Sequence, residues 1–186
     1  MTRNILPILI TASVFLAGLA LAQAPAANPK IVFKTTKGDI TIELYPAKAP
    51  VTVKNILGYV QDKFYDGTIF HRVIPGFMIQ CGGLTADMAT KQGQAPIKNE
   101  SGNGLTNARG MVAMARTNEL DSATSQFYIN LVDNFRLDEA KYCSFGKVVA
   151  GMDVVDAIAK VPTGSKRGHQ NVPLEPVTIL SASVVK

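Results

Sequence analysis

The chain has 186 residues, of which 47% are hydrophobic and 18% charged, a composition typical of one packed globular domain. The formal net charge is +5, and the basic residues are scattered apart from the short run 166–167, which argues against a nucleic-acid-binding groove. The two histidines and two cysteines do not have the spacing of zinc ligands, so a structural zinc site is not indicated either.

The first 22 residues have the pattern of a cleavable signal peptide. Arg3 is their only charged residue, residues 5–20 are predominantly apolar, and Ala20 and Ala22 are the small residues that a signal peptidase recognises. A retained membrane anchor is the alternative. We favour cleavage because the apolar stretch is shorter than the roughly 20 residues that a bilayer requires, and because it contains Pro7.

This interpretation divides the chain into a signal peptide (1–22), a flexible segment (23–29) and one folded domain (30–186). Without the leader, 18 basic residues against 14 acidic ones leave a net charge of +4. No later stretch is apolar for long enough to span a membrane. We therefore expect an exported, soluble product without stable membrane insertion after cleavage.

The domain is predicted to begin with a β-hairpin and a helix. Two alternating apolar runs flank the turn at 37–39, and they place Ile40, Ile42 and Leu44 on one face of a strand. Residues 49–64 then change to a helical spacing of apolar residues, with a proline suited to the first turn.

The rest of the domain is predicted to be mainly β. Further strand-like runs occupy 68–73, 77–80, 111–115, 126–130, 144–149 and 177–184. A second helix is predicted over 152–160, and the aperiodic segment 83–110 is expected to be a long ordered loop, a kind of segment that often carries function. About eight strands and two helices indicate a closed or sandwiched β-domain.

The cysteines, Cys81 and Cys143, allow two interpretations. In an oxidising compartment a pair of thiols often forms a disulfide, but bridging requires the two Cα atoms to lie within about 7 Å. The alternative is two small buried hydrophobic residues. The spacing along the chain does not decide between them.

Two common chemistries find little support. No Gly-x-Ser-x-Gly motif accompanies His71, and a single histidine in an apolar run is more often a packed core residue than a catalytic base. The glycine-rich stretch 100–110 lacks the Lys-Ser/Thr pair and the following helix of a phosphate-binding loop. Neither hydrolysis nor nucleotide binding is indicated.

Four longer motifs resemble the cyclophilin family of peptidyl-prolyl cis-trans isomerases. They are FHRVIPGFMIQCGG at 70–83, GMVAMA at 110–115, SQFYI at 125–129 and YCSFGKVVAGMDVVDAI at 142–158. The resemblance covers residues 31–186, and with the leader and the closing segment it is most similar to the periplasmic cyclophilins of Gram-negative bacteria.

The resemblance implies a closed eight-stranded antiparallel β-barrel capped by two helices. It also implies a periplasmic isomerase that acts on proline-containing polypeptides, without covalent intermediate, metal or cofactor. A shallow groove that contacts mainly the proline ring and the peptide backbone would discriminate little between clients, and we expect a monomer.

Arg72 is the candidate catalytic residue. Rotation about an X-Pro bond is slow because amide resonance imposes a barrier of about 20 kcal/mol. A donor aimed at the prolyl nitrogen would localise its lone pair, an interaction that is stronger in the twisted state than in the planar one. A guanidinium keeps its proton, so Arg72 would act through a charge-assisted hydrogen bond rather than as an acid.

The resemblance assigns the other residues of the groove. Gln80 and Phe77 accompany Arg72 as catalytic residues, with Gln80 and Gln126 bonding substrate carbonyls or orienting the arginine. The residues expected to bind substrate are Met78, Ala115, Arg116, Gln126, Tyr128, Leu137 and Tyr142. Taken singly, most of these would be interpreted as core or surface residues, and only their joint spacing favours a binding groove.

The chain departs from the family at 135–138. It has Phe-Arg-Leu-Asp where many members have Glu-Trp-Leu-Asp, and it contains no tryptophan. Because that tryptophan is associated in the family with binding of the macrocycle cyclosporin, we expect weak cyclosporin binding with retained activity. Phe135 could substitute in part. The alternative function is a chaperone-like binder of proline-containing or unfolded segments with little turnover.

Overall fold

The structure, a computed structural model, describes residues 27–185. Its strands are β1 (Lys30–Thr35), β2 (Gly38–Leu44), β3 (Arg72–Ile74), β4 (Met78–Cys81), β5 (Met111–Met114), β6 (Phe127–Asn130), β7 (Ser144–Ala150), β8 (Thr163–Lys166), β9 (His169–Pro173) and β10 (Ile179–Val184). Its helices are α1 (Pro50–Gln61), α2 (Arg136–Glu139) and α3 (Met152–Ile158). The predicted leader and most of the flexible segment lie outside the described residues.

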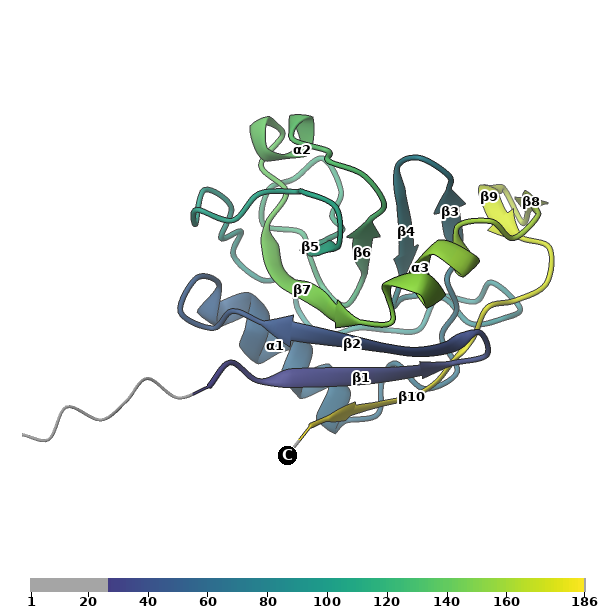
Figure 1. Ribbon diagram of the computed structural model, residues 1–186, viewed down its shortest axis with the longest axis horizontal. Coiled ribbons are helices and arrows are strands. Elements are labelled where there is room, and N and C mark those ends of the chain that lie inside the picture. Colours follow the sequence, from purple (N-terminus) through teal and green to yellow (C-terminus); the bar gives the residue numbers. More distant parts are fainter. Residues whose placement is uncertain (1–26, 186) are drawn as a thin grey trace, which may run out of the picture.

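Eight of the strands form one antiparallel sheet in the order β10-β1-β2-β7-β5-β6-β4-β3, and β8 pairs with β9 in a separate hairpin. In Figure 1, β1, β2 and β10 run across the direction of β3, β4 and β6, so the sheet curves around its core. The edge strands β3 and β10 do not share a ladder. Backbone hydrogen bonds between residues 67–70 and 177–179 join these two edges instead.

The predicted fold class is therefore confirmed, although the barrel is closed by an isolated bridge rather than by a continuous ladder. The run predicted as one strand from residue 68 is irregular until Arg72, and the bridge between Ile69 and Thr178 lies in this irregular stretch. The opening hairpin is also confirmed, and Ile40, Ile42 and Leu44 are all buried in the core.

The two predicted helices are present, and α2 is an additional short one. Helix α1 has Pro50 in its first turn, where the missing N–H costs no helical hydrogen bond. The carboxylate of Glu100 accepts hydrogen bonds from the Val51 and Thr52 backbone N–H groups, at 3.0 and 2.8 Å. Glu100 thus caps the helix and fixes the long loop 83–110 against it.

Alternation along β3, β4, β6 and β5 separates two rows of side chains. Cross-strand neighbours in one row are Val73, Ile79, Ile129 and Val112, all buried in the main core. The neighbouring row contains Arg72, Gln80, Tyr128 and Ala113, which point to the opposite face because successive residues of a strand alternate. One face of these four strands therefore supports the core and the other presents polar and aromatic groups.

Within residues 27–185, no helix is long and apolar enough to cross a bilayer. The two cysteines are both free and both buried, so the structure supports the second of the two interpretations given above. Burial raises the pKa of Cys81 and of Cys143, which keeps both thiols protonated and unreactive near neutral pH.

Candidate functional site

A groove with a volume of about 530 Å³ lies over the outward row of β3, β4, β6 and β5. In Figure 1, helix α2 and the β8–β9 hairpin stand on opposite sides of β6, β4 and β3. The groove brings together all ten residues expected at the site: Arg72, Phe77, Met78, Gln80, Ala115, Arg116, Gln126, Tyr128, Leu137 and Tyr142. These residues come from five separate segments of the chain.

The register of the sheet sets the position of Arg72. Arg72 lies opposite Gln80 on β4, and Gln80 lies opposite Tyr128 on β6. The Arg72 Nη1 is 3.5 Å from Gln80 Oε1, a long and weak contact, whereas Gln80 Nε2 donates to Gln126 Oε1 at 2.9 Å. The two glutamines thus form a stable pair beside a guanidinium that keeps most of its donors free.

Gln126 can take this position because residue 83 is a glycine. A Cβ atom at Gly83 would lie only 2.5 Å from the Cγ and Nε2 atoms of Gln126. The backbone of Gly83 does not have a positive φ. Glycine is therefore needed here because it lets the Gln126 side chain approach the backbone closely, and not because it allows an unusual conformation.

The floor of the groove is apolar. Met78, Ala113 and Tyr128 form a small buried cluster that is separate from the main core. Against it pack Ile74, Phe77, Ala115, Leu137 and Tyr142, which are only partly buried. This combination of aromatic rings, a thioether and a branched side chain is suited to a small apolar ring such as pyrrolidine.

Beneath the floor, the amide of Asn107 connects the aromatic wall to the segment of α2. Its Oδ1 accepts hydrogen bonds from the Tyr128 hydroxyl at 2.8 Å and from Asn130 Nδ2 at 3.2 Å. Its Nδ2 donates to Asp138 Oδ1 at 2.7 Å, and its backbone N–H donates to the same oxygen at 2.8 Å. Burial raises the pKa of Tyr128, so its hydroxyl remains a donor to Asn107.

The network continues to Phe77. Asn134 Nδ2 donates to Asn130 Oδ1 at 2.8 Å and to the backbone oxygen of Phe77 at 2.9 Å. Asn107 and Asn130 are fully buried, and Asn134 nearly so. Buried polar groups that are all paired hold their neighbours in one arrangement. Three walls of the groove, at Tyr128, Phe77 and α2, are therefore held by one set of amides, which the sequence analysis did not identify.

Two arginines flank the groove over aromatic rings. The guanidinium carbon of Arg116 lies 4.5 Å from the centroid of the Tyr142 ring, and that of Arg136 lies 5.2 Å from the centroid of Phe77. Phe135, the other residue considered at this position, is 54% exposed and does not line the groove. Arg136 thus replaces the family's tryptophan with a cation at the edge of the apolar floor.

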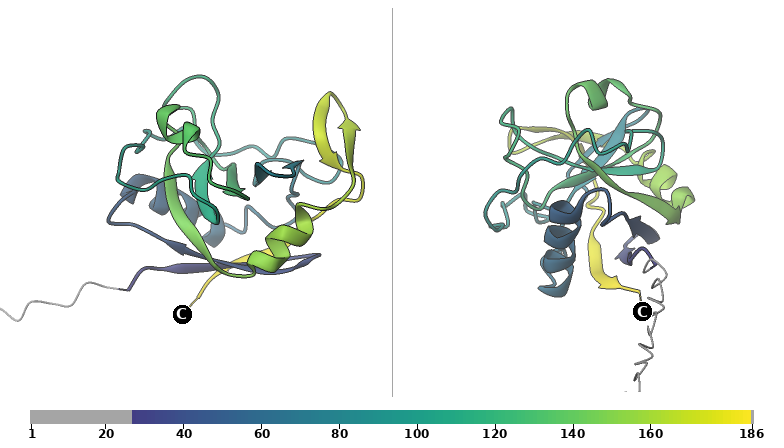
Figure 2. Two further views of the ribbon diagram at one scale, coloured as in Figure 1. Left: turned by 45° about the horizontal axis from the view of Figure 1, so that its top comes forward. Right: turned by 90° about the vertical axis from the view of Figure 1, so that its left-hand side faces the viewer.

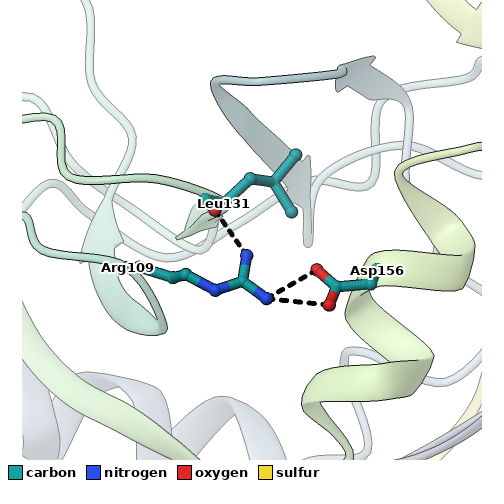
Figure 3. A network of polar contacts seen from close by, with 3 residues as sticks. All are labelled: Arg109, Leu131 and Asp156. Atoms are coloured by element: carbon teal, nitrogen blue, oxygen red, sulfur yellow. Dashed lines mark hydrogen bonds and ion pairs between the residues drawn. The ribbon is translucent and has the colours of Figure 1, made fainter.

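Unlike Arg116 and Arg136, Arg109 forms an ion pair with a carboxylate, which Figure 3 shows. Arg109 Nη2 donates to both carboxylate oxygens of Asp156, at 2.7 and 2.9 Å, and its Nη1 donates to the backbone oxygen of Leu131. This is the one ion pair found within residues 27–185. The cations of the groove have no comparable carboxylate partner in that part of the chain.

His71, next to Arg72, also lines the groove but is only 5% exposed. Burial disfavours the imidazolium form and lowers the pKa of His71 to about 4. Its Nδ1 has no hydrogen-bond partner among the described residues. His71 is therefore neutral near pH 7, in agreement with its interpretation as a packed residue rather than a base.

The far wall of the groove is the tip of the β8–β9 hairpin, at residues 168–171. Figure 2 shows this hairpin projecting from the body of the sheet. The sequence analysis missed it because residues 163–173 are mostly polar and show no hydrophobic alternation. The signal available in the sequence was Gly168, a residue typical of tight turns. In the structure Arg167 and Gly168 form the turn of this hairpin, and both have a positive φ.

Comparisons with known proteins agree with this geometry. The profile of the family described as "Cyclophilin type peptidyl-prolyl cis-trans isomerase/CLD" matches residues 30–184. A "Peptidyl-prolyl cis-trans isomerase" of Acinetobacter baylyi is 53% identical, with 92% of this chain and 94% of that protein covered. A "Peptidyl-prolyl cis-trans isomerase A" of Dickeya dadantii is 47% identical over the full length of both chains.

Solved structures show the same fold. A crystal structure of a cyclophilin type peptidyl-prolyl cis-trans isomerase from Cryptosporidium parvum has a TM-score of 0.76 at 25% identity, covering 86% of this chain and 98% of that one. A second structure of that protein, in the presence of the dipeptide Ala-Pro, has a TM-score of 0.74 at 26% identity, covering 84% and 99% of the two chains.

Proposed function

Since this chain belongs to the cyclophilin-type peptidyl-prolyl cis-trans isomerases, we propose that the groove around Arg72 is where it rotates X-Pro bonds. The observation that carries this proposal is the placement of one weakly engaged guanidinium beside the apolar floor of the groove. The proline ring would rest on Phe77, Met78, Tyr128 and Leu137, with Arg72 facing the prolyl nitrogen.

Catalysis would come from a difference in binding between two states of the same bond. As the amide twists, its nitrogen becomes pyramidal and gains a localised lone pair, to which Arg72 can donate. Within residues 27–185, Arg72 has only the 3.5 Å contact with Gln80 to give up, so little is lost when it turns to substrate. The Gln80–Gln126 pair would orient Arg72 and bond the neighbouring peptide carbonyls.

The substrate backbone would lie along the end of β5. The Ala115 N–H already bonds the Gln126 carbonyl, and β5 pairs with β6 on one side and with β7 on the other, so the backbone left for a peptide begins beyond the strand, at Arg116. An extended peptide can pair with such a segment through main-chain hydrogen bonds, a mode of recognition that depends little on side chains. The Ala-Pro dipeptide present with the Cryptosporidium parvum protein supports a proline-sized ligand for this fold.

The pattern of residues 1–22 supports an exported, periplasmic enzyme that acts on proteins folding after export. We expect it to act as a monomer. The replacement of tryptophan by Arg136 supports weak cyclosporin binding, because a charged side chain now occupies the edge of the floor at Phe77. Inhibition by nanomolar cyclosporin would contradict this expectation.

The test is an isomerisation assay on the wild type, Arg72→Ala and Arg72→Lys. We expect kcat/KM of Arg72→Ala to fall about 100-fold, the usual loss when one donor to a transition state is removed. Arg72→Lys should recover only part of the activity, because an ammonium lacks the planar fork of donors. Equal rates for Arg72→Ala and the wild type would remove Arg72 from catalysis. If the wild-type protein bound the peptide without isomerising it, that result would favour the alternative function of a chaperone-like binder.

A further inference from the structure

The charged side chains that line the groove are all positive. Of residues 27–185, the arginines Arg72 and Arg116 line it, and no aspartate or glutamate does. Arg136 stands over the Phe77 ring at its edge. Two guanidiniums thus line the groove and a third stands at its edge, and a proline ring alone offers them no negative charge.

None of these three arginines forms an ion pair with a carboxylate of residues 27–185. Asp138, on the same short helix as Arg136, directs one carboxylate oxygen at the backbone and side chain of Asn107. Asp87 is fully exposed, and its pKa is lowered mainly by the hydrogen bond that it accepts from the Thr85 hydroxyl. The only ion pair within residues 27–185 is the one between Arg109 and Asp156.

Arg116 and Arg136 differ in how many of their hydrogen-bond donors remain free. Arg116 donates through Nη1 to the Thr117 and Asn118 carbonyls and through Nη2 to Ala140, so it contributes mainly its positive field. Arg136 donates no side-chain hydrogen bond to any of residues 27–185, and its guanidinium is held near Phe77 by contact with the ring. Its planar fork is therefore free to bind a carboxylate through two parallel hydrogen bonds.

From this arrangement we infer that the groove selects X-Pro segments in which an aspartate or glutamate immediately precedes the proline. This inference rests on the proposed function, because it places the proline on the apolar floor, against Phe77 and Leu137. With the ring seated there, the neighbouring residues of the peptide pass beneath Arg136 and Arg116. An acidic side chain forms an ion pair with Arg136 and is also attracted by the positive charge of Arg116. A lysine at the same position is repelled by both arginines. The preference should decrease with salt, since the pairing takes place at an exposed edge.

The experiment compares three peptides that differ only in the residue before proline, which is Glu, Gln or Lys. Exchange NMR measures the catalysed cis-trans rate directly, so the specificity of a coupling protease does not enter. We expect kcat/KM for the Glu peptide to exceed that for the Gln peptide about two- to fivefold at low salt, with the Lys peptide slowest. At 0.5 M salt the three values should converge.

Two variants test the source of the preference. Arg136→Gln should reduce the ratio of the Glu to the Gln peptide toward one. Lys34→Gln removes the same charge from the exposed face of β1, several strands away in the sheet, and should leave that ratio as in the wild type.

Equal rates for the three peptides, or a preference for Lys, would overturn the inference while leaving the isomerase proposal intact. An unchanged ratio in Arg136→Gln would also overturn it. No turnover of any peptide by the wild type would instead overturn the proposed function.

Discussion

Two regions of the molecule use arginine in opposite ways. Beside α3, Arg109 binds both oxygens of Asp156 and the carbonyl of Leu131, so its charge is matched and its donors are used. In the groove, Arg72 has one 3.5 Å contact with Gln80, and at its edge Arg136 contacts the Phe77 ring and donates no side-chain hydrogen bond to residues 27–185. The comparison indicates that the Arg109 ion pair links parts of the scaffold, while Arg72 and Arg136 keep donors free for a ligand.

The groove is nonetheless held firmly, by buried amides rather than by charges. Asn107, Asn130 and Asn134 bond one another and reach Tyr128, Asp138 and the Phe77 carbonyl. An amide offers both a donor and an acceptor, so it can link several walls without adding a charge. The following changes are ordered from the largest expected effect to the smallest.

Asn107→Ala should have the largest effect, because it leaves the buried Tyr128 hydroxyl without its acceptor and removes one of the two hydrogen bonds that Asp138 accepts from residue 107. We expect the free energy of unfolding to fall by about 3 kcal/mol and kcat/KM to fall with it. Urea denaturation and the isomerisation assay measure the two effects. Asn103→Ala, in the same loop but bonded to the Ser144 carbonyl, is the matched control and should cost less. Equal losses in the two variants would show that the network has no special role.

The pH dependence of stability tests His71. Its pKa is about 4 in the folded protein and 6.5 in the unfolded chain, so between these values the unfolded state binds more protons. Stability should therefore fall as pH decreases from 6.5 toward 4, by at most about 1.4 kcal/mol per pH unit. Chemical denaturation of the wild type and His71→Gln at several pH values isolates this contribution. Parallel pH curves for the two proteins would contradict a lowered pKa.

Gly83→Ala should lower activity without unfolding the protein. Its Cβ would displace the side chain of Gln126, break the pair with Gln80 and leave Arg72 less well oriented. We expect a loss of about tenfold in kcat/KM, since small misplacements of catalytic groups have effects of at least this size. Gly58→Ala makes the same chemical change in α1, where a Cβ contacts nothing, and should stabilise that helix slightly. Similar activities of the two variants would show that Gln126 does not orient the site.

Arg109→Gln should have the smallest effect, and unlike Gly83→Ala it should lower stability rather than activity. The Arg109 and Asp156 side chains are 45% and 39% exposed, so solvent screens the pair and its loss should cost about 0.5–1 kcal/mol. Activity should stay at the wild-type value, because Arg109 is not among the residues that line the groove. A marked fall in kcat/KM would show that the two regions are coupled.

Much of this molecule follows from local patterns in the sequence. Period-two alternation predicts which residues of the first hairpin face the core, and helical spacing with Pro50 predicts α1. The motif spacing identifies the family and names ten residues that the structure brings into one groove. These features are predictable because each depends on residues close together in the chain or on a motif of fixed length.

What only the tertiary structure decided is how distant segments meet. Asn107 bonds Tyr128 and Asp138, which are 21 and 31 positions away, and such contacts leave no periodic signal in the sequence. The same holds for the polar β8–β9 hairpin that forms the far wall, for the two thiols that remain free, and for the position of Arg136 over Phe77. Each depends on how segments far apart in the chain pack against one another, which short-range patterns in the sequence do not encode.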